Sequence, residues 1–213
     1  METPKNPLSI DSRIREGLSR LATVLRADEW DRAKALGLNP TQLSILTLLE
    51  GRPLGLGVKE IAAQLGVSQP SATDSINALE KKGHVEKRPG LADARAVSVQ
   101  LSQSGIKILQ QTAGSDMVGK AIGALGNDRQ QDLLVTLVGM IRDLQERDAI
   151  PVQRMCVTCR HFDPFAHPRG DQPYHCHFVN AAFGRRELRI DCRDHDQADP
   201  TFRAATWEAF QAG

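Results

Sequence analysis

Residues 58–83 read VKEIAAQLGVSQPSATDSINALEKKG, and this stretch decides the fold. Its first part predicts a two-turn helix that ends at Gly66, since glycine readily adopts the left-handed conformation found at helix ends. Ser68 then predicts the N-cap of a second helix, because a serine hydroxyl accepts a hydrogen bond from the first turn. Two helices joined by so short a turn predict a helix-turn-helix.

The second of these helices has two unlike faces. Ala72, Ile76 and Leu79 fall on one side at helical spacing, which predicts that they are buried. The opposite side carries short polar residues, among them Thr73 and Asn77. A helix that enters a major groove needs such donors and acceptors for base edges. A solvated surface helix shows the same pattern, so this segment alone leaves both interpretations open.

The residues that follow the helix predict a β-hairpin. Segments 84–88 and 96–101 alternate apolar and polar residues, and the stretch between them contains Pro and Gly. A helix-turn-helix followed directly by a two-stranded wing is a winged helix. Arg95 at the tip can reach a minor groove or phosphates, and Asp93 can hold it extended through a charge-assisted hydrogen bond. The wing also carries Lys87 and Arg88.

Three further helices are predicted around this motif. Apolar residues recur every three or four positions through a first helix over about residues 9–36. A second helix begins at Asn39-Pro40, an N-cap followed by a first-turn proline, and ends before the Gly- and Pro-rich residues 51–57. A last helix begins near Asn127. The chain to residue 150 is therefore expected to be mostly α, with a small β-wing.

These segments resemble the MarR family of winged-helix transcriptional regulators. The resemblance is carried by NPTQL at 39–43, IAAQLGVSQPS at 61–71, LEKKG at 79–83, and DAR at 93–95 followed by LSQSG at 101–105. It spans about residues 9–148 and implies a homodimer, in which the first and last two helices of each subunit pack together. The two recognition helices would then contact successive major-groove segments of a palindromic double-stranded operator, about 34 to 36 Å apart.

The resemblance also implies which residues contact DNA. Ser71, Thr73 and Asn77 would contact bases or phosphates, and Arg95, positioned by Asp93, would enter the minor groove. Asp74 departs from the family pattern, because a carboxylate there repels phosphate unless it accepts from a cytosine amino group. Many relatives bind a small effector in an apolar pocket, so a small-molecule partner is also expected. The full predicted DNA-binding set is Ser68, Gln69, Ser71, Thr73, Asn77, Lys81, Lys87, Arg88, Asp93 and Arg95.

The overall composition excludes several classes of protein. The chain has 213 residues, 27 Lys and Arg against 26 Asp and Glu, and 40% apolar residues, which predicts a soluble globular protein. Residues 133–141, the longest apolar stretch, are far short of the ~20 residues that cross a bilayer, so no membrane partner is expected. Residues 1–7 lack the apolar segment of a secretory signal, which predicts a cytoplasmic location.

The composition changes sharply near Pro151. Residues 151–213 hold eight of the nine aromatic residues, all four Cys and five of the six His, whereas all eight Lys precede them. We therefore expect two units: a winged-helix and dimerisation domain over residues 1–150, and a small Cys-rich module over residues 151–213.

The four cysteines of the second unit predict a metal site. Disulfides are rare in a reducing cytoplasm, and clustering with His makes four unrelated buried thiols a weaker interpretation. Cys156-x2-Cys159 paired with Cys192-x2-His195 suits tetrahedral zinc, and Cys176 either replaces His195 or lies outside the site. Zinc would stabilise a segment too small to fold on hydrophobic burial alone.

An iron–sulfur cluster bound by all four Cys is the alternative. The intervals of 16 and 15 residues that separate Cys176 from Cys159 and Cys192, together with the surrounding Phe and Tyr, resemble high-potential iron–sulfur proteins. Arg154, Arg160 and Arg193 lie close to the cysteines in sequence and would offset the negative charge of either metal site.

The sequence thus predicts a non-enzymatic regulator, expected to be a repressor, whose C-terminal module stabilises the dimer or senses metal or redox state. Two alternatives use the Cys-rich tail: a thiol redox enzyme and a protein-interaction module. Against the enzyme, Cys156-x2-Cys159 does not begin a helix of a βαβ unit, where thiol redox pairs are found.

Overall fold

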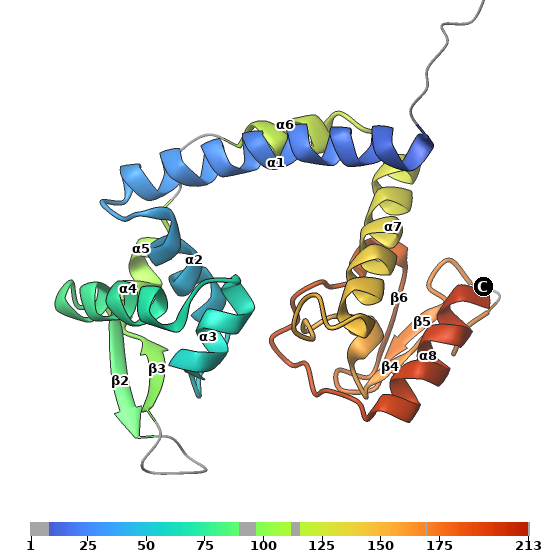
Figure 1. The fold of residues 1–213 in the computed structure, drawn as a ribbon. Coiled ribbons are helices and arrows are strands. Elements are labelled where there is room, and N and C mark those ends of the chain that lie inside the picture. Colours follow the sequence, from blue (N-terminus) through green and yellow to red (C-terminus); the bar gives the residue numbers. More distant parts are fainter. Residues whose placement is uncertain (1–8, 90–96, 112–115, 169, 213) are drawn as a thin grey trace, which may run out of the picture.

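The computed structural model describes residues 9–89, 97–111, 116–168 and 170–212, and it shows two compact units connected by long helices (Figure 1). The first unit and the connecting helices comprise α1 (Ile10–Ala35), α2 (Pro40–Leu49), β1 (Leu56–Gly57), α3 (Val58–Leu65), α4 (Gln69–Lys81), β2 (Val85–Pro89), β3 (Val97–Leu101), α5 (Gln103–Leu109), α6 (Met117–Gly123) and α7 (Asn127–Glu146). The second unit comprises the 3-10 helices η1 (Cys156–Thr158) and η2 (Arg185–Glu187), the strands β4 (Phe162–Asp163), β5 (Tyr174–Cys176) and β6 (Ala181–Phe183), and α8 (Pro200–Ala212).

The predicted helix-turn-helix is confirmed as α3 and α4. Gly66 ends α3 with a φ of 63°, a left-handed conformation that costs glycine little because it has no Cβ. Ser68 caps α4, since its Oγ accepts a hydrogen bond from the Ser71 N–H at 3.2 Å. The predicted cap of α2 is also present: the Asn39 side chain accepts from the Gln42 N–H at 2.8 Å.

The predicted hairpin is confirmed as β2 and β3, which pair antiparallel from Val85 opposite Leu101 to Pro89 opposite Val97. A third strand that the sequence pattern did not indicate, β1, pairs with the other edge of β3, so that the strand order is β1-β3-β2. The wing is therefore anchored to the loop that precedes α3, in addition to its connection with α4.

The core of the first unit lies beneath α4. Ala72, Ile76 and Leu79 are all 0% exposed, as the spacing predicted. They pack in one apolar cluster with residues of α2, α3 and the sheet, among them Ile45, Leu46, Leu49, Ile61, Val85 and Val99. Burial of this face fixes the rotation of α4 and turns its polar residues outward.

Helix α1 extends away from this core, with α6 alongside it (Figure 1). The Asp28 carboxylate of α1 accepts hydrogen bonds from two backbone N–H groups at the start of α6, those of Met117 at 2.7 Å and Val118 at 3.4 Å. The amphipathic helix was predicted correctly, but most of its large apolar side chains are left exposed by the described residues. Those on α1 that are exposed are Ile10, Ile14, Leu18, Leu21, Val24, Leu25 and Trp30.

The second unit has its own core, to which α7 contributes. Val138 of α7 packs with Met155, Phe162, Tyr174 and Phe210. Aromatic rings meet edge to face or tilted, with centroids 5.5 Å apart for Phe162 and Tyr174 and 5.7 Å apart for Tyr174 and Phe210. The boundary predicted at residue 150 therefore separates α7 in sequence from the unit against which it packs. Among the described residues, no helix is both long and apolar enough to span a membrane.

Candidate functional site

The outward face of α4 presents the predicted DNA-contacting residues at its N-terminal end. Ser68, Gln69 and Ser71 are exposed there, whereas Thr73 and Asn77 are half-buried. The Thr73 hydroxyl donates to the Gln69 carbonyl at 2.8 Å, and the two serine hydroxyls lie 2.8 Å apart. The exposed uncharged polar side chains of α4 are thus concentrated in its first turn, where the helix dipole favours an anion.

The wing and α4 are held together by a charged side chain. Lys87 Nζ on β2 donates to Asn77 Oδ1 at 2.6 Å and to Glu80 Oε2 at 2.8 Å, so this predicted phosphate contact is engaged within the protein. Arg88 is likewise paired, with Glu86 at 2.8 Å. Lys81, exposed in the last turn of α4, has no ion-pair partner in the part of the chain that the structure describes. Asp93 and Arg95 lie outside the described residues.

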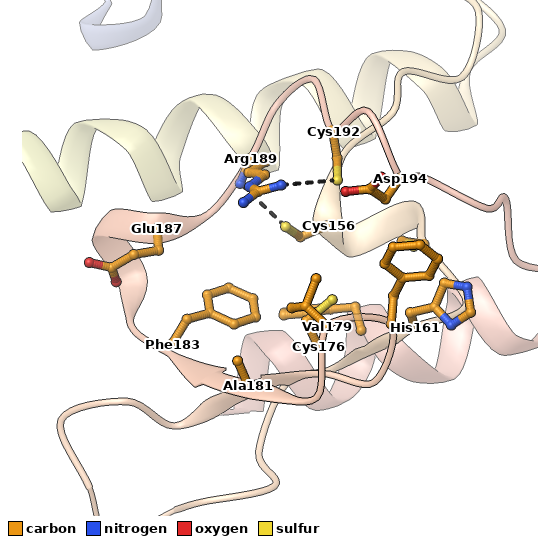
Figure 2. Close-up of a pocket in the computed structure, with 13 residues that line it drawn as sticks. Cys156, His161, Cys176, Val179, Ala181, Phe183, Glu187, Arg189, Cys192 and Asp194 are labelled. Atoms are coloured by element: carbon orange, nitrogen blue, oxygen red, sulfur yellow. Dashed lines mark hydrogen bonds between the residues drawn. The ribbon is translucent and has the colours of Figure 1, made fainter. Parts of the chain in front are cut away.

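The four cysteines converge on one cavity in the second unit (Figure 2). Cys156 lies on η1 and Cys159 directly after it, Cys176 ends β5, and Cys192 follows η2. The cavity has a volume of about 390 Å³. All four are free thiols. The structure thus brings together residues that are up to 36 positions apart in sequence, as a common ligand set requires.

The walls of this cavity are largely apolar, and the polar contacts to sulfur come from one residue. The Arg189 N–H donates to Cys156 Sγ at 3.3 Å, and its guanidinium Nη1 donates to Cys192 Sγ at 3.5 Å (Figure 2). Burial raises the pKa of Cys156 to about 11, and the neighbouring thiols act in the same direction. Phe162, Phe178, Val179, Ala181 and Phe183 supply the apolar wall.

His195, predicted as a possible zinc ligand, lies outside this cavity. Its Nε2 is 3.0 Å from the Thr158 hydroxyl, and it lines a separate cavity with Arg154 and Arg193. Burial lowers the pKa of His195 below its ordinary value. Among the described residues, no three side chains of His, Cys, Asp and Glu come close enough together to hold a single metal ion.

The arginines predicted to offset the thiolates pair elsewhere. Arg154 donates to Asp191 at 2.6 Å, Arg160 pairs with Asp196 at 3.2 Å, and Arg193 with Glu50 at 3.3 Å. The arginine that contacts the sulfurs is Arg189, which the sequence analysis missed. Its position three residues before Cys192 was the available signal, but nothing in the local pattern distinguishes it from other arginines of the segment.

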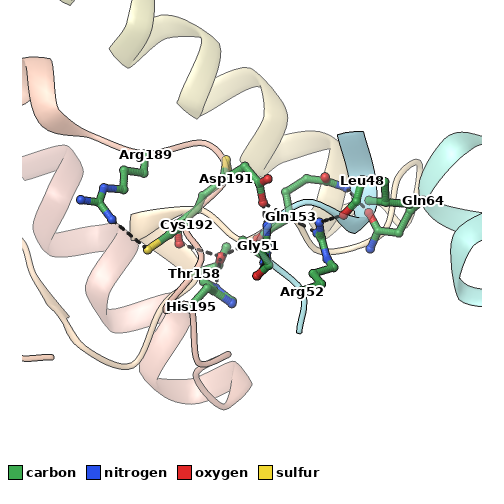
Figure 3. A network of polar contacts seen from close by, with 12 residues as sticks. Leu48, Gly51, Arg52, Gln64, Gln153, Thr158, Arg189, Asp191, Cys192 and His195 are labelled. Atoms are coloured by element: carbon green, nitrogen blue, oxygen red, sulfur yellow. Dashed lines mark hydrogen bonds and ion pairs between the residues drawn. The ribbon is translucent and has the colours of Figure 1, made fainter. Parts of the chain in front are cut away.

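A polar network joins the cysteine unit to the winged helix (Figure 3). Asp191, adjacent to Cys192, accepts from Arg154 and lies 3.7 Å from Arg52, which is in the loop after α2. Burial of Asp191 would raise its pKa, but the hydrogen bond and charge of Arg154 and the charge of Arg52 outweigh it, so the pKa is lowered. Gln153 donates to Gln64 of α3 at 3.1 Å. The second unit is thereby connected to the loop after α2 through Asp191 and to α3 through Gln153.

A second, larger cavity lies between the two units. Its volume is about 780 Å³, and the sequence analysis could not assign its residues. It is lined by α1, α2, α3 and the second unit, with charged groups from Asp28, Arg32, Arg52 and Asp191. A pocket of this size accepts a drug-sized molecule.

Comparison with known proteins finds similarity to MarR proteins in the first unit of the chain. A model described as MarR family matches residues 36–96, from the end of α1 into the wing, and does not reach the cysteines. A MarR protein from Peptoclostridium difficile is 17% identical, with a TM-score of 0.54, covering 69% of this chain and 97% of that one. A MarR transcriptional regulator from Methanosarcina mazei is 18% identical, with a TM-score of 0.52, covering 63% of this chain and 98% of that one. Identities this low show a shared fold.

Proposed function

We propose that this chain, whose residues 36–96 match a model described as MarR family, is a homodimeric transcriptional regulator that binds double-stranded DNA. The observation that carries the proposal is the orientation of α4. Its apolar side, Ala72, Ile76 and Leu79, is buried against the core, its first turn presents exposed Ser68, Gln69 and Ser71, and its C-terminal half is bonded to the wing through Lys87. This is the arrangement in which a recognition helix enters a major groove while a wing contacts the adjacent backbone.

The proposal of a dimer rests on apolar side chains that this chain leaves uncovered. The stripe from Ile10 to Leu25 on α1 is joined by exposed Met117 and Ile122 on α6, which lies alongside α1 (Figure 1). Contiguous apolar surface of this kind is unfavourable in water and is typical of protein interfaces. A symmetric dimer through these helices would present two copies of α4 to a palindromic operator.

We expect this dimer to act as a repressor in the cytoplasm, by covering an operator that overlaps the start of transcription. A small molecule in the 780 Å³ cavity would contact α1, α2 and the second unit together. Such a ligand would alter affinity for DNA if it favoured one relative placement of these elements.

A thiol redox enzyme is the weaker candidate. Such enzymes need a reactive thiolate, and therefore a cysteine whose pKa is lowered. Burial acts in the opposite direction at Cys156 and raises its pKa to about 11.

The experiment that tests the DNA-binding proposal is selection of duplexes from a random pool by the purified protein, followed by titration of the recovered sequence. We expect a palindromic consensus with half-sites one helical turn apart. Gln69→Ala should weaken binding to this duplex by roughly tenfold or more. Gln172→Ala, which removes an exposed glutamine of the second unit, should leave binding unchanged. A protein that selects no sequence would refute the proposal.

The dimer is tested separately by sedimentation. Leu21→Glu on the apolar stripe of α1 should produce monomers, since it buries an unpaired charge in the proposed interface. Leu54→Glu is the control, because Leu54 is equally apolar and exposed but lies in the loop before α3. Equal sedimentation of both variants and the parent protein would contradict the assigned interface.

A further inference from the structure

We propose that the cysteine-lined cavity binds a four-iron iron–sulfur cluster, with Cys156, Cys159, Cys176 and Cys192 as its four ligands. The inference goes beyond DNA binding and does not depend on it. It begins from the convergence of four thiols on one cavity, which are carried by η1, the residue after it, the end of β5 and the loop after η2.

The spacing of the thiols favours a cluster over a single metal ion. A zinc ion holds four sulfurs at about 2.3 Å from one point, so its ligands are in mutual contact. Here no group of three or more His, Cys, Asp or Glu side chains that could hold one metal ion is found among the described residues, and the four cysteines line a cavity of about 390 Å³. A cubane cluster carries its own irons and sulfides between the cysteines, so its ligands must surround a space of this kind.

All four cysteines line this cavity, and the other side chains on its wall that could donate to a metal are His161, Glu187 and Asp194. His195, the one histidine at zinc-ligand spacing from Cys192, is directed to the Thr158 hydroxyl at 3.0 Å and lines another cavity. His161 lies on the wall but adjoins Asp196, 3.9 Å from its carboxylate. Four cysteines are the usual ligands of iron–sulfur clusters, including those with four irons.

The surroundings of the thiols suit a cluster in two further ways. Phe162, Phe183 and Val179 form an apolar wall that limits the access of water to the space between the sulfurs. Arg189 donates from its backbone to Cys156 and from its guanidinium to Cys192. Hydrogen bonds to ligating sulfurs, together with limited solvent exposure, stabilise the charge of a bound cluster and set its reduction potential.

The backbone holds each ligand in place before anything binds. The Cys159 N–H donates to the Cys156 carbonyl at 2.9 Å, and the Cys192 N–H donates to the Arg154 carbonyl at 2.8 Å. Cys176 is paired with Phe162 in the β4–β5 ladder. The ligand positions are therefore part of the folded second unit and are not supplied by a loose tail.

The direct test is ligand exchange under argon between the full-length protein and a synthetic four-iron, four-sulfide cluster capped by small thiolates. Each cysteine thiol gives its proton to a departing thiolate as its sulfur takes that place on iron, so no electron is transferred. We expect four irons and four sulfides per chain, with a broad absorption near about 400 nm. A parallel sample receives zinc alone.

Single substitutions identify the ligands. Cys176→Ser and Cys192→Ser should each reduce iron retained after gel filtration by at least half, whereas His195→Gln should retain the full complement. Circular dichroism of each variant before exchange shows whether it is folded. The iron and sulfide content of the parent protein tests the proposal even if a variant does not fold. Binding of one zinc ion per chain with no uptake of the cluster would overturn the proposal. Recovery of four titratable free thiols after both treatments would overturn it equally.

Discussion

Lys81→Ala is the substitution for which the structure predicts the clearest effect on DNA binding. Lys81 is exposed in the last turn of α4, and its ammonium has no ion-pair partner among the described residues, so it is available to a phosphate. A dimer loses two such contacts. The association constant K for DNA falls as salt rises, and each lost phosphate contact makes the slope of log K against log salt concentration less steep by about 0.9. Loss of two contacts should therefore make this slope less steep by about 1.8. At a salt concentration of about 0.1 M this corresponds to roughly 60-fold weaker binding.

The assay is titration of a selected duplex by fluorescence anisotropy over a series of salt concentrations. Lys120→Ala on α6 is the matched control, because it removes an equally exposed lysine far from α4 and the wing (Figure 1). Lys87→Ala should change the slope less than Lys81→Ala, since Lys87 is already paired with Glu80. A slope for Lys81→Ala equal to that of the parent dimer, with folding intact, would refute the assignment of Lys81 to a phosphate contact.

The remaining predictions concern the junction between the units, the wing and the helix-turn-helix. Asp191→Asn should destabilise the folded protein by about 1 kcal/mol, because the side chains of Arg154 and Arg52 are only 15% and 12% exposed and lose their anionic partner. The 56% exposure of the Asp191 side chain limits the effect. An unchanged midpoint of urea unfolding would show that these ion pairs do not stabilise the contact between the two units. Because the pKa of Asp191 is lowered on folding, its ion pairs contribute fully to the free energy of unfolding above about pH 4, and this contribution declines on further acidification. Urea unfolding at a series of pH values would measure the decline. Arg95→Ala should weaken DNA binding and leave the unfolding midpoint in place, so equal affinity would show that the wing tip is not a contact. Gly66→Ala should cost about 1 kcal/mol of unfolding free energy through its positive φ alone, since an added Cβ would meet no atom within 4 Å, and a stability equal to the parent's would contradict this.

The helix-turn-helix was predictable because its signals are local. The glycine that ends α3, the serine that caps α4 and the spacing of Ala72, Ile76 and Leu79 all act within one or two helical turns. The hairpin of β2 and β3 was predictable for the same reason. Strand β1 was not, because two residues carry no alternation and their pairing with β3 joins segments about 40 positions apart.

The helix α7 and the cysteines were likewise predictable only in their local features. The periodicity of α7 predicted a helix but not its partner, since an apolar face packs equally well on any complementary core. Val138 is buried against the second unit, beyond the boundary that composition indicated. The cysteines could be recognised as a set from their number and spacing, but spacing alone left zinc and a cluster both open.

By itself, the order of residues determined the winged helix, the amphipathic character of α1 and the concentration of all four cysteines after residue 150, because each depends on short-range periodicity, capping or composition. Only the tertiary structure decided that those four thiols surround a cavity, that Arg189 donates to them while His195 is directed to Thr158, and that Asp191 connects their unit to Arg52. These features depend on which segments, distant in sequence, come into contact when α7 packs against the small sheet. Local sequence patterns do not specify such contacts.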